Sequence, residues 1–130
     1  HVKMSATESE ILKYYSNVYN ALRVIFANSM YELCNSFNAD YDIIKSSFVK
    51  RGTSTGKYLT VNKKWRGYGG VCLPKDTKAI ISLVEQLGLN LDLFKTIDKE
   101  NDKFLTTVPG GISNRRSRIY CWLFNRKAIK

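Results

Sequence analysis

Apolar residues recur every three or four positions along the first third of the chain, and neither glycine nor proline interrupts the segment from Ser5 to Phe37. The apolar positions are Ile11, Tyr14, Tyr15, Val18, Leu22, Ile25, Phe26, Met30, Leu33, Cys34 and Phe37. This spacing predicts one amphipathic helix of about 30 residues, whose apolar stripe needs core or dimer packing along its length. Ser5 and Glu8 have the spacing of a capping box, which predicts the helix start.

Beyond the long helix, the apolar positions and capping residues predict three shorter helices. Asp40 or Asp42 is expected to cap a helix over residues 41–50. Apolar residues on one side predict another helix from Asp76 to about Gly88, and a last one over about 91–104. The predicted fold class is therefore all-α. It consists of a long amphipathic helix packed with three shorter helices, a glycine-rich catalytic loop and an irregular basic tail.

Residues 65–76 carry the densest chemical signal and read Trp-Arg-Gly-Tyr-Gly-Gly-Val-Cys-Leu-Pro-Lys-Asp. Three glycines in four positions allow unusual backbone angles and a close approach of the main chain to a ligand. Cys72 is nucleophilic as its thiolate, which the cations of Lys75 and Arg66 favour. Asp76 is of the kind that orients or deprotonates a water. The stretch predicts a nucleophilic site, against the alternative of a glycine-rich turn with a buried structural cysteine.

The net charge of +10 is unevenly distributed. Residues 1–105 hold 15 basic and 11 acidic side chains, whereas residues 106–130 hold 6 basic and no acidic ones. We therefore divide the chain into a helical domain, 1–105, and a basic tail of unassigned structure, 106–130. The modest excess on the helical domain suits an anionic small molecule, and a basic tail is a feature of nonspecific nucleic-acid binding.

The cysteines and the hydropathy of the sequence indicate the cellular location and the kinds of partner. Cys34, Cys72 and Cys121 are widely separated, odd in number and without the paired spacing of a metal site. A reducing, cytoplasmic location fits them better than a disulfide framework, and we expect no metal. No apolar stretch approaches the length of about 18 residues that a membrane span needs, so we expect no membrane partner. The opening residues lack a signal-peptide pattern and look like the continuation of a preceding segment.

Residues 67–76 resemble the active-site loop of the UDP-glucose/GDP-mannose dehydrogenase family, whose signature runs Gly-aromatic-Gly-Gly-x-Cys-Leu/Phe-Pro-Lys-Asp. The resemblance covers roughly residues 4–104 and implies the central helical domain of that family. It implies an NAD-dependent double oxidation of the primary alcohol of a nucleotide sugar, most commonly UDP-glucose, to a carboxylate. Cys72 then forms a thiohemiacetal and a thioester, which a water oriented by Asp76 hydrolyses.

The resemblance also implies roles for residues outside the cysteine. Lys13 and Asn17 are four positions apart, hence on one helix face, where they would otherwise be a solvated edge. In the family such a pair reaches the sugar carbon undergoing oxidation, where it can stabilise a developing oxyanion. The backbone of Gly69 and Gly70 is implied to let the sugar and the nicotinamide approach.

Further residues are implied to bind substrate or cofactor. Tyr58 and Leu59 resemble an aromatic-Leu segment that lines the nucleotide-sugar site. Arg51 stands nearest to an arginine that, in the family, reaches the substrate of the neighbouring subunit, although the aspartate that accompanies it is missing here. Cys72 and Lys75 are implied to face the NAD cofactor.

No part of the sequence matches the Gly-x-Gly-x-x-Gly turn that cradles a dinucleotide. We therefore expect a fragment of the dehydrogenase that is inactive alone and forms a homodimer through its long helix. A stand-alone dimerisation or nucleotide-sugar-binding module without catalysis stays open, as does a nucleic-acid-binding role of the tail, although we favour no nucleic-acid partner. UDP-N-acetyl sugars and GDP-mannose also stay open as substrates.

Overall fold

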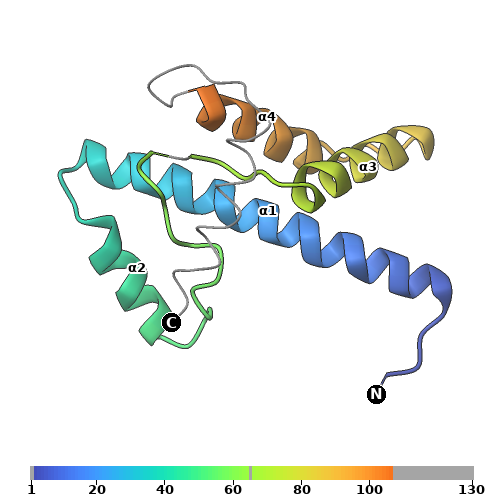
Figure 1. The fold of residues 1–130 in the computed structure, drawn as a ribbon, viewed down its shortest axis with the longest axis horizontal. Helices are drawn as coiled ribbons and strands as arrows, with labels where there is room; N and C mark the ends of the chain where they lie inside the picture. Colours follow the sequence, from blue (N-terminus) through green and yellow to red (C-terminus); the bar gives the residue numbers. More distant parts are fainter. Residues whose placement is uncertain (1, 65, 107–130) are drawn as a thin grey trace.

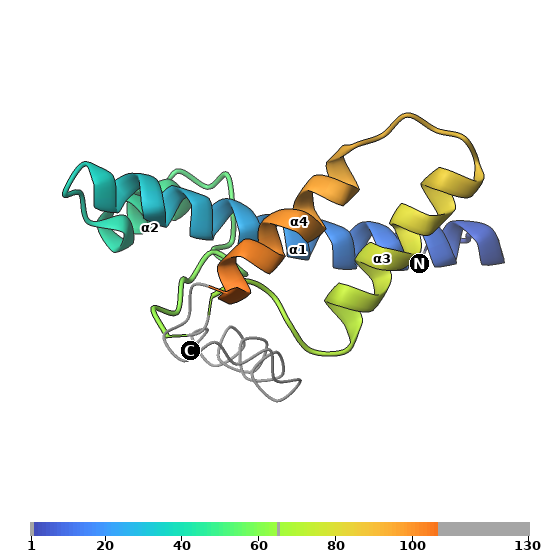
Figure 2. The ribbon, with the colours of Figure 1, turned by 90° about the horizontal axis from the view of Figure 1, so that it is seen from above.

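The computed structural model describes residues 2–64 and 66–106, which form four helices and no strand. The helices are α1 (Ala6–Ser36), α2 (Tyr41–Lys50), α3 (Cys72–Gln86) and α4 (Leu93–Thr106). Helix α1 contacts the other three, and α3 also contacts α4. Figures 1 and 2 show α2 beside the C-terminal half of α1, with α3 and α4 packed against the rest of its length. The predicted all-α class is confirmed, whereas the predicted tail lies outside the described residues except for Thr106.

Helix α1 begins and ends with local hydrogen bonds that its sequence encodes. The Ser5 hydroxyl accepts the Glu8 N–H at 3.2 Å, and the Glu8 carboxylate accepts the Ser5 N–H at 2.6 Å, which confirms the capping box. The helix has 31 residues and is therefore about 46 Å long. It ends in a Schellman motif, where Asn38 takes a φ of 52° and the Ala39 N–H donates to the Cys34 carbonyl at 2.9 Å.

Two apolar clusters hold the helices together. The first joins α1 to α3, α4 and the loop before α3, and it comprises Val18, Ala21, Val24, Ile25, Tyr68, Leu73, Ile97 and Phe104. The second joins α1 to α2 and the following loop, and it comprises Ala27, Cys34, Tyr41 and Leu59. The Tyr41 hydroxyl donates to the Leu59 carbonyl at 2.7 Å, which ties the loop to α2. Cys34, one of the apolar positions of the predicted helix, is thus a small buried core residue.

Helix α3 starts earlier than predicted. The sequence places its start at Asp76, whereas the helix begins at Cys72. Pro74 is tolerated because it lies in the first turn, where backbone amides have no partner within the helix. The side chain of Leu73 is buried in the first cluster, which fixes this turn against α1. Cys72 therefore lies at the start of a helix and not in a loop. At the other end, the predicted stop at Gly88 is confirmed, because Gly88 lies just beyond the helix with a φ of 63°.

The remaining helix ends agree closely with the prediction. Asp40 caps α2, because its carboxylate accepts the Asp42 and Ile43 amides at 2.7 and 3.2 Å. Helix α4 begins and ends about two residues later than predicted, a difference common at helix ends. Among the described helices, none combines the length and the apolar content that a membrane span requires.

Candidate active site

Cys72 is an exposed free thiol at the first residue of α3. The amides of a first helical turn point toward the helix start without an intrahelical partner, and no side chain caps this end of α3. Negative charge that develops beside the sulfur therefore meets the positive end of the helix dipole. A structural cysteine would be buried, whereas Cys72 is exposed.

Asp76 lies one helical turn after Cys72 and is 1% exposed. Its Oδ2 accepts a hydrogen bond from the Asn17 side-chain amide at 2.5 Å, and its Oδ1 pairs with the ammonium of Lys75. Asn17 comes from α1, so this contact joins the two helices that carry the predicted catalytic residues. The structure thus brings Asn17 and Asp76 together, although they are 59 positions apart in the sequence.

The surroundings of Asp76 favour its ionised form. Burial raises the pKa of Asp76, but hydrogen bonds from Lys75 and Asn17, together with the positive charges of Lys75 and Lys13, lower the pKa. The lowering prevails, and the pKa of Asp76 lies below its ordinary value of 3.8. Asp76 is therefore a fixed hydrogen-bond acceptor at neutral pH and a weak proton acceptor.

Lys13 lies one turn before Asn17 on α1, at the exposed end of the same group. Its ammonium pairs with Glu10 at 2.6 Å, and this hydrogen bond raises the pKa of Lys13. The charge of Asp76 raises it further, so Lys13 stays cationic. The structure thus places Lys13 and Lys75 near one buried carboxylate, and ammonium groups of this kind can stabilise an anionic intermediate.

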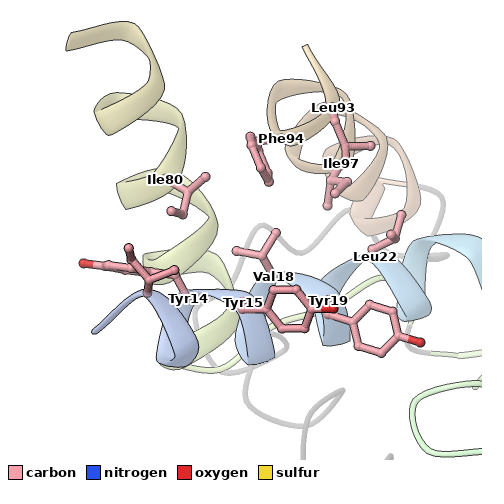
Figure 3. A pocket seen from close by; sticks show the side chains of 10 residues that line it. Tyr14, Tyr15, Val18, Tyr19, Leu22, Ile80, Leu93, Phe94 and Ile97 are labelled. Atoms are coloured by element: carbon pink, nitrogen blue, oxygen red, sulfur yellow. The ribbon is translucent and has the colours of Figure 1, made fainter. Parts of the chain in front are cut away.

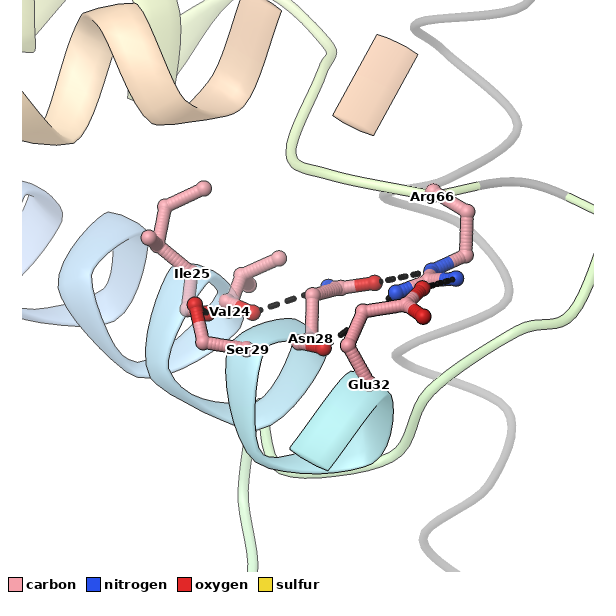
Figure 4. Close-up of polar contacts among 6 residues, drawn as sticks. All are labelled: Val24, Ile25, Asn28, Ser29, Glu32 and Arg66. Atoms are coloured by element: carbon pink, nitrogen blue, oxygen red, sulfur yellow. Dashed lines mark hydrogen bonds and ion pairs between the residues drawn. The ribbon is translucent and has the colours of Figure 1, made fainter. Parts of the chain in front are cut away.

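Arg66 holds the loop before α3 against α1 (Figure 4). Its Nε donates to the Asn28 side-chain carbonyl at 2.5 Å, and its Nη1 pairs with Glu32 at 2.6 Å. Its guanidinium also lies over the rings of Tyr31 and Phe104, about 5 Å from each centroid. Arg66 is buried, and Glu32 neutralises its charge. Its role is therefore to anchor the loop, which differs from the predicted role of favouring a thiolate.

Asn101 of α4 holds the next part of this loop, a contact that sequence reasoning missed. Its side-chain carbonyl accepts the Tyr68 N–H at 2.6 Å, and its amide donates to the Tyr68 carbonyl at 3.0 Å. A Cβ on Gly67 would lie 2.6 Å from the Asn101 oxygen, and Gly67 has a φ of 76°, so this position requires glycine. The available signal was a polar residue on the apolar face that Ile97 and Phe104 define in α4.

Other predicted site residues lie elsewhere or contribute only backbone. Arg51 is the exposed C-cap of α2, and Figures 1 and 2 place that helix away from the start of α3. Leu59 is buried in the second cluster, and Tyr58 packs against the first with a φ of 62°, which is uncommon for a bulky residue. Gly69 and Gly70 lead directly into the start of α3.

A cavity of about 330 Å³ opens between α1, α3 and α4 (Figure 3). Tyr15 and Tyr19 of α1, Ile80 of α3 and Phe94 of α4 contribute to its apolar lining. None of the polar residues described above lines this cavity, so it is separate from the candidate active site. Within the described part of the chain, no group of three or more His, Cys, Asp or Glu residues is placed to hold a metal ion.

Comparison with known proteins identifies the family of this helical domain. The model of the UDP-glucose/GDP-mannose dehydrogenase family, central domain, matches residues 7–103. This chain therefore belongs to the UDP-glucose/GDP-mannose dehydrogenase family and corresponds to its central domain.

Three relatives are UDP-glucose 6-dehydrogenases. That of Campylobacter jejuni is 37% identical over 109 residues, which cover 81% of this chain and 26% of the relative. That of Pseudomonas aeruginosa is 31% identical over 100 residues, 75% of this chain and 21% of the relative. That of Bacillus subtilis is 26% identical over 121 residues, 88% of this chain and 26% of the relative. The chain thus spans about a quarter of the length of these relatives.

The close packing at Gly67 predicts that Gly67→Ala lowers the free energy of unfolding more than Gly52→Ala. Both glycines have a φ of 76°, so either alanine carries about 1–2 kcal/mol of left-handed strain. Only at Gly67 does the new Cβ also meet Asn101, whereas nothing lies within 4 Å at Gly52. Urea unfolding of the two variants measures the difference, and equal losses would contradict the close contact.

The lowered pKa of Asp76 predicts a specific pH dependence of stability. Its carboxylate adds stability that is fully present above its ordinary pKa of 3.8 and is lost as the pH falls through the lower folded-state pKa. The difference in unfolding free energy between the unmodified chain and Asp76→Asn should therefore shrink in acid. Asn17→Ala removes one donor, which raises the folded-state pKa and moves the loss to higher pH. Urea unfolding from neutral to acidic pH tests this, and a difference independent of pH would refute it.

Proposed function

We propose that this chain supplies the cysteine side of the active site of an NAD-dependent nucleotide-sugar 6-dehydrogenase, with UDP-glucose as substrate. The observation that carries the proposal is the arrangement at the start of α3, where exposed Cys72 precedes buried Asp76 by one turn and Asp76 is bonded to Asn17 of α1. The relatives support the reaction, because those described above are UDP-glucose 6-dehydrogenases.

The proposed chemistry needs a nucleophile that retains the aldehyde between the two oxidations. When the complete enzyme binds NAD, two molecules of the cofactor in succession would each accept one hydride as the primary alcohol becomes a carboxylate. The thiolate of Cys72 adds to the aldehyde carbon and forms a thiohemiacetal bound through sulfur. The aldehyde oxygen then carries negative charge, which Lys13, Asn17 and the free amides at the start of α3 can stabilise.

Asp76 serves the hydrolytic step in this proposal. After the thiohemiacetal is oxidised to a thioester, water adds to its carbonyl carbon and the sulfur of Cys72 leaves, which releases the carboxylate product. Because its pKa is lowered, Asp76 suits the orientation of a water better than the removal of its proton. The hydrogen bond to Asn17 and the ion pair with Lys75 fix the carboxylate for this task.

The residues of this chain fit only the reactive end of an NAD site. Gly67 and Gly69 have the first spacing of a Gly-x-Gly-x-x-Gly turn, but Cys72 occupies the third position, and no strand precedes the glycines in the described residues. Cys72 and Lys75 are the proposed cofactor contacts, and the dinucleotide cradle must come from another part of the enzyme. A free thiol nucleophile supports a reducing, cytoplasmic location.

We also infer that the chain forms a homodimer through one face of α1. Six exposed apolar side chains share this face and define the α1 stripe. They are Ile11, Tyr15, Tyr19, Phe26, Leu33 and Phe37. The stripe runs for about 39 Å along the helix. This length is sufficient for an interface that buries roughly 800 Å² on each partner, the area typical of stable complexes. The apolar cavity opens at Tyr15 and Tyr19 and extends the same surface.

The α1 stripe alone also supports a second reading, a dimerisation or nucleotide-sugar-binding module without catalysis. The two readings differ only in the chemistry of Cys72. A nucleic-acid-binding role of the tail concerns residues beyond those described, and we propose no nucleic-acid partner. A variant of Cys72 therefore decides between the dehydrogenase and the module.

The dehydrogenase proposal predicts that Cys72→Ala abolishes the overall oxidation. The test replaces the matching segment of the Campylobacter jejuni relative with residues 7–103 and measures NADH formed from UDP-glucose and NAD. Cys72→Ala should lower the rate at least about 100-fold, because the nucleophile is lost. Cys34→Ala is the matched control and should keep the activity, since Cys34 lies in the core.

The isolated chain is the negative control of this experiment and should form no NADH. If the folded chimera oxidises UDP-glucose equally well with and without the Cys72 thiol, the proposed role of Cys72 is wrong. An inactive but folded chimera would favour the module without catalysis.

The dimer proposal predicts that charges in the middle of the α1 stripe dissociate the dimer. Sedimentation equilibrium at micromolar concentration should give a dimer for the unmodified chain and a monomer for Tyr19→Lys combined with Phe26→Lys. The interface of the variant would bury four ammonium groups, two from each copy, without partners. Ile43→Lys changes an exposed apolar residue on α2, outside the α1 stripe, and should leave the dimer intact. A monomeric unmodified chain would contradict the proposal.

A further inference from the structure

We propose that Asn101 is a positioning residue, which holds the glycine-rich backbone ahead of Cys72 in the geometry that the active site needs. Asn101 is 3% exposed and forms two hydrogen bonds with the main chain of Tyr68, one in each direction. The bonds measure 2.6 and 3.0 Å. The two bonds satisfy the main-chain N–H and C=O of Tyr68. Because Tyr68 is itself buried, solvent does not compete for these groups.

The side-chain amide of Asn101 has the chemistry that this contact requires. It offers one acceptor and one donor in a fixed plane, as a peptide group does, and so it pairs with Tyr68 as a neighbouring strand would. An aspartate keeps the acceptor but replaces the donor with a negative charge, and an alanine removes both. Gly67 leaves the space that the Asn101 oxygen needs, because a Cβ there would approach to 2.6 Å.

The loop is held from two helices at neighbouring positions. Arg66 bonds to Asn28 and Glu32 of α1, and two residues later Tyr68 bonds to Asn101 of α4. Because the stretch from 66 to 68 is fixed on both sides, Gly69 and Gly70 start from a defined main-chain position and lead into the first turn of α3. Holding these glycines before substrate arrives lowers the cost of ordering them in the reaction.

The purpose of this positioning rests on the proposed function, since the sugar and the nicotinamide are proposed to approach the glycine backbone. The positioning itself is independent of turnover. It requires only that the loss of Asn101 loosens residues 68–71 and changes access to the neighbouring thiol, while α3 and the core stay folded.

The test uses the full chain with Cys121→Ser, so that Cys72 is the exposed thiol under study. Amide exchange by NMR and the rate of alkylation by iodoacetamide are measured for Asn101→Ala and Asn101→Asp, with circular dichroism to confirm folding. The matched control is Tyr41→Phe, which removes a buried hydrogen bond to the Leu59 carbonyl at the other end of the domain.

We expect Asn101→Ala to raise amide exchange over residues 68–71 by about tenfold, because a buried polar group is left unsatisfied. The alkylation rate of Cys72 should rise several-fold, and Asn101→Asp should change both quantities in the same direction, because its carboxylate faces the Tyr68 carbonyl without a donor. Tyr41→Phe should change neither quantity in the loop. If Asn101→Ala is unfolded, Asn101→Asp compared with Tyr41→Phe carries the test.

Unchanged exchange over residues 68–71 in a folded Asn101 variant would overturn the proposal. The same change in Tyr41→Phe would also overturn it, since the loop would then report only general stability. A loosened loop together with a chimera in which Cys72→Ala keeps full activity would refute the dehydrogenase chemistry and leave the positioning intact. The two failures are therefore distinguishable.

Discussion

A carboxylate that leaves water must receive hydrogen bonds or opposite charge, and the arrangement of this domain depends on how Asp76 meets that requirement. Asp76 is buried at the junction of α1 and α3, where Asn17 supplies the donor from the other helix. The contact helps to set how α3 lies against α1, because a shift by one residue would break the hydrogen bond between Asn17 and Asp76. Cys72, one turn earlier, is thereby placed over the N-terminal half of α1. The Cys72 thiol can stay exposed because its neighbours are fixed beneath it.

The same physical rule governs the loop that precedes the thiol. Two buried polar residues hold it to different helices: Arg66 of the loop bonds to α1, and Asn101 of α4 bonds to the loop at Tyr68. A loop rich in glycine is entropically costly to hold, so a domain that needs it in one position must supply such contacts. Buried polar pairs therefore precede and follow Cys72 in the chain. Apolar packing brings the helices together, and these pairs select one arrangement of them.

Much of the fold could be predicted because helix signals are local. The spacing of apolar residues, the Ser5–Glu8 capping box and the stop at Gly88 each concern neighbours within a few positions. The start of α3 was mispredicted because it depends on the burial of Leu73 against α1, which no local pattern contains. The contact of Asp76 with α1 was likewise invisible to residue spacing, since it joins positions 59 apart. Polar residues at helical core positions are the signal worth following in such cases.

The geometry of α1 gives the proposed dimer a consequence for the site. One face of α1 packs against α3 and α4, and its exposed stripe extends from Ile11 to Phe37. A two-fold axis that crosses the middle of such a stripe places two copies of α1 antiparallel. The α2 end of one copy then lies beside the Cys72 end of its partner. Arg51, at the C-cap of α2, would then lie at the same end of the proposed dimer as the partner's Cys72.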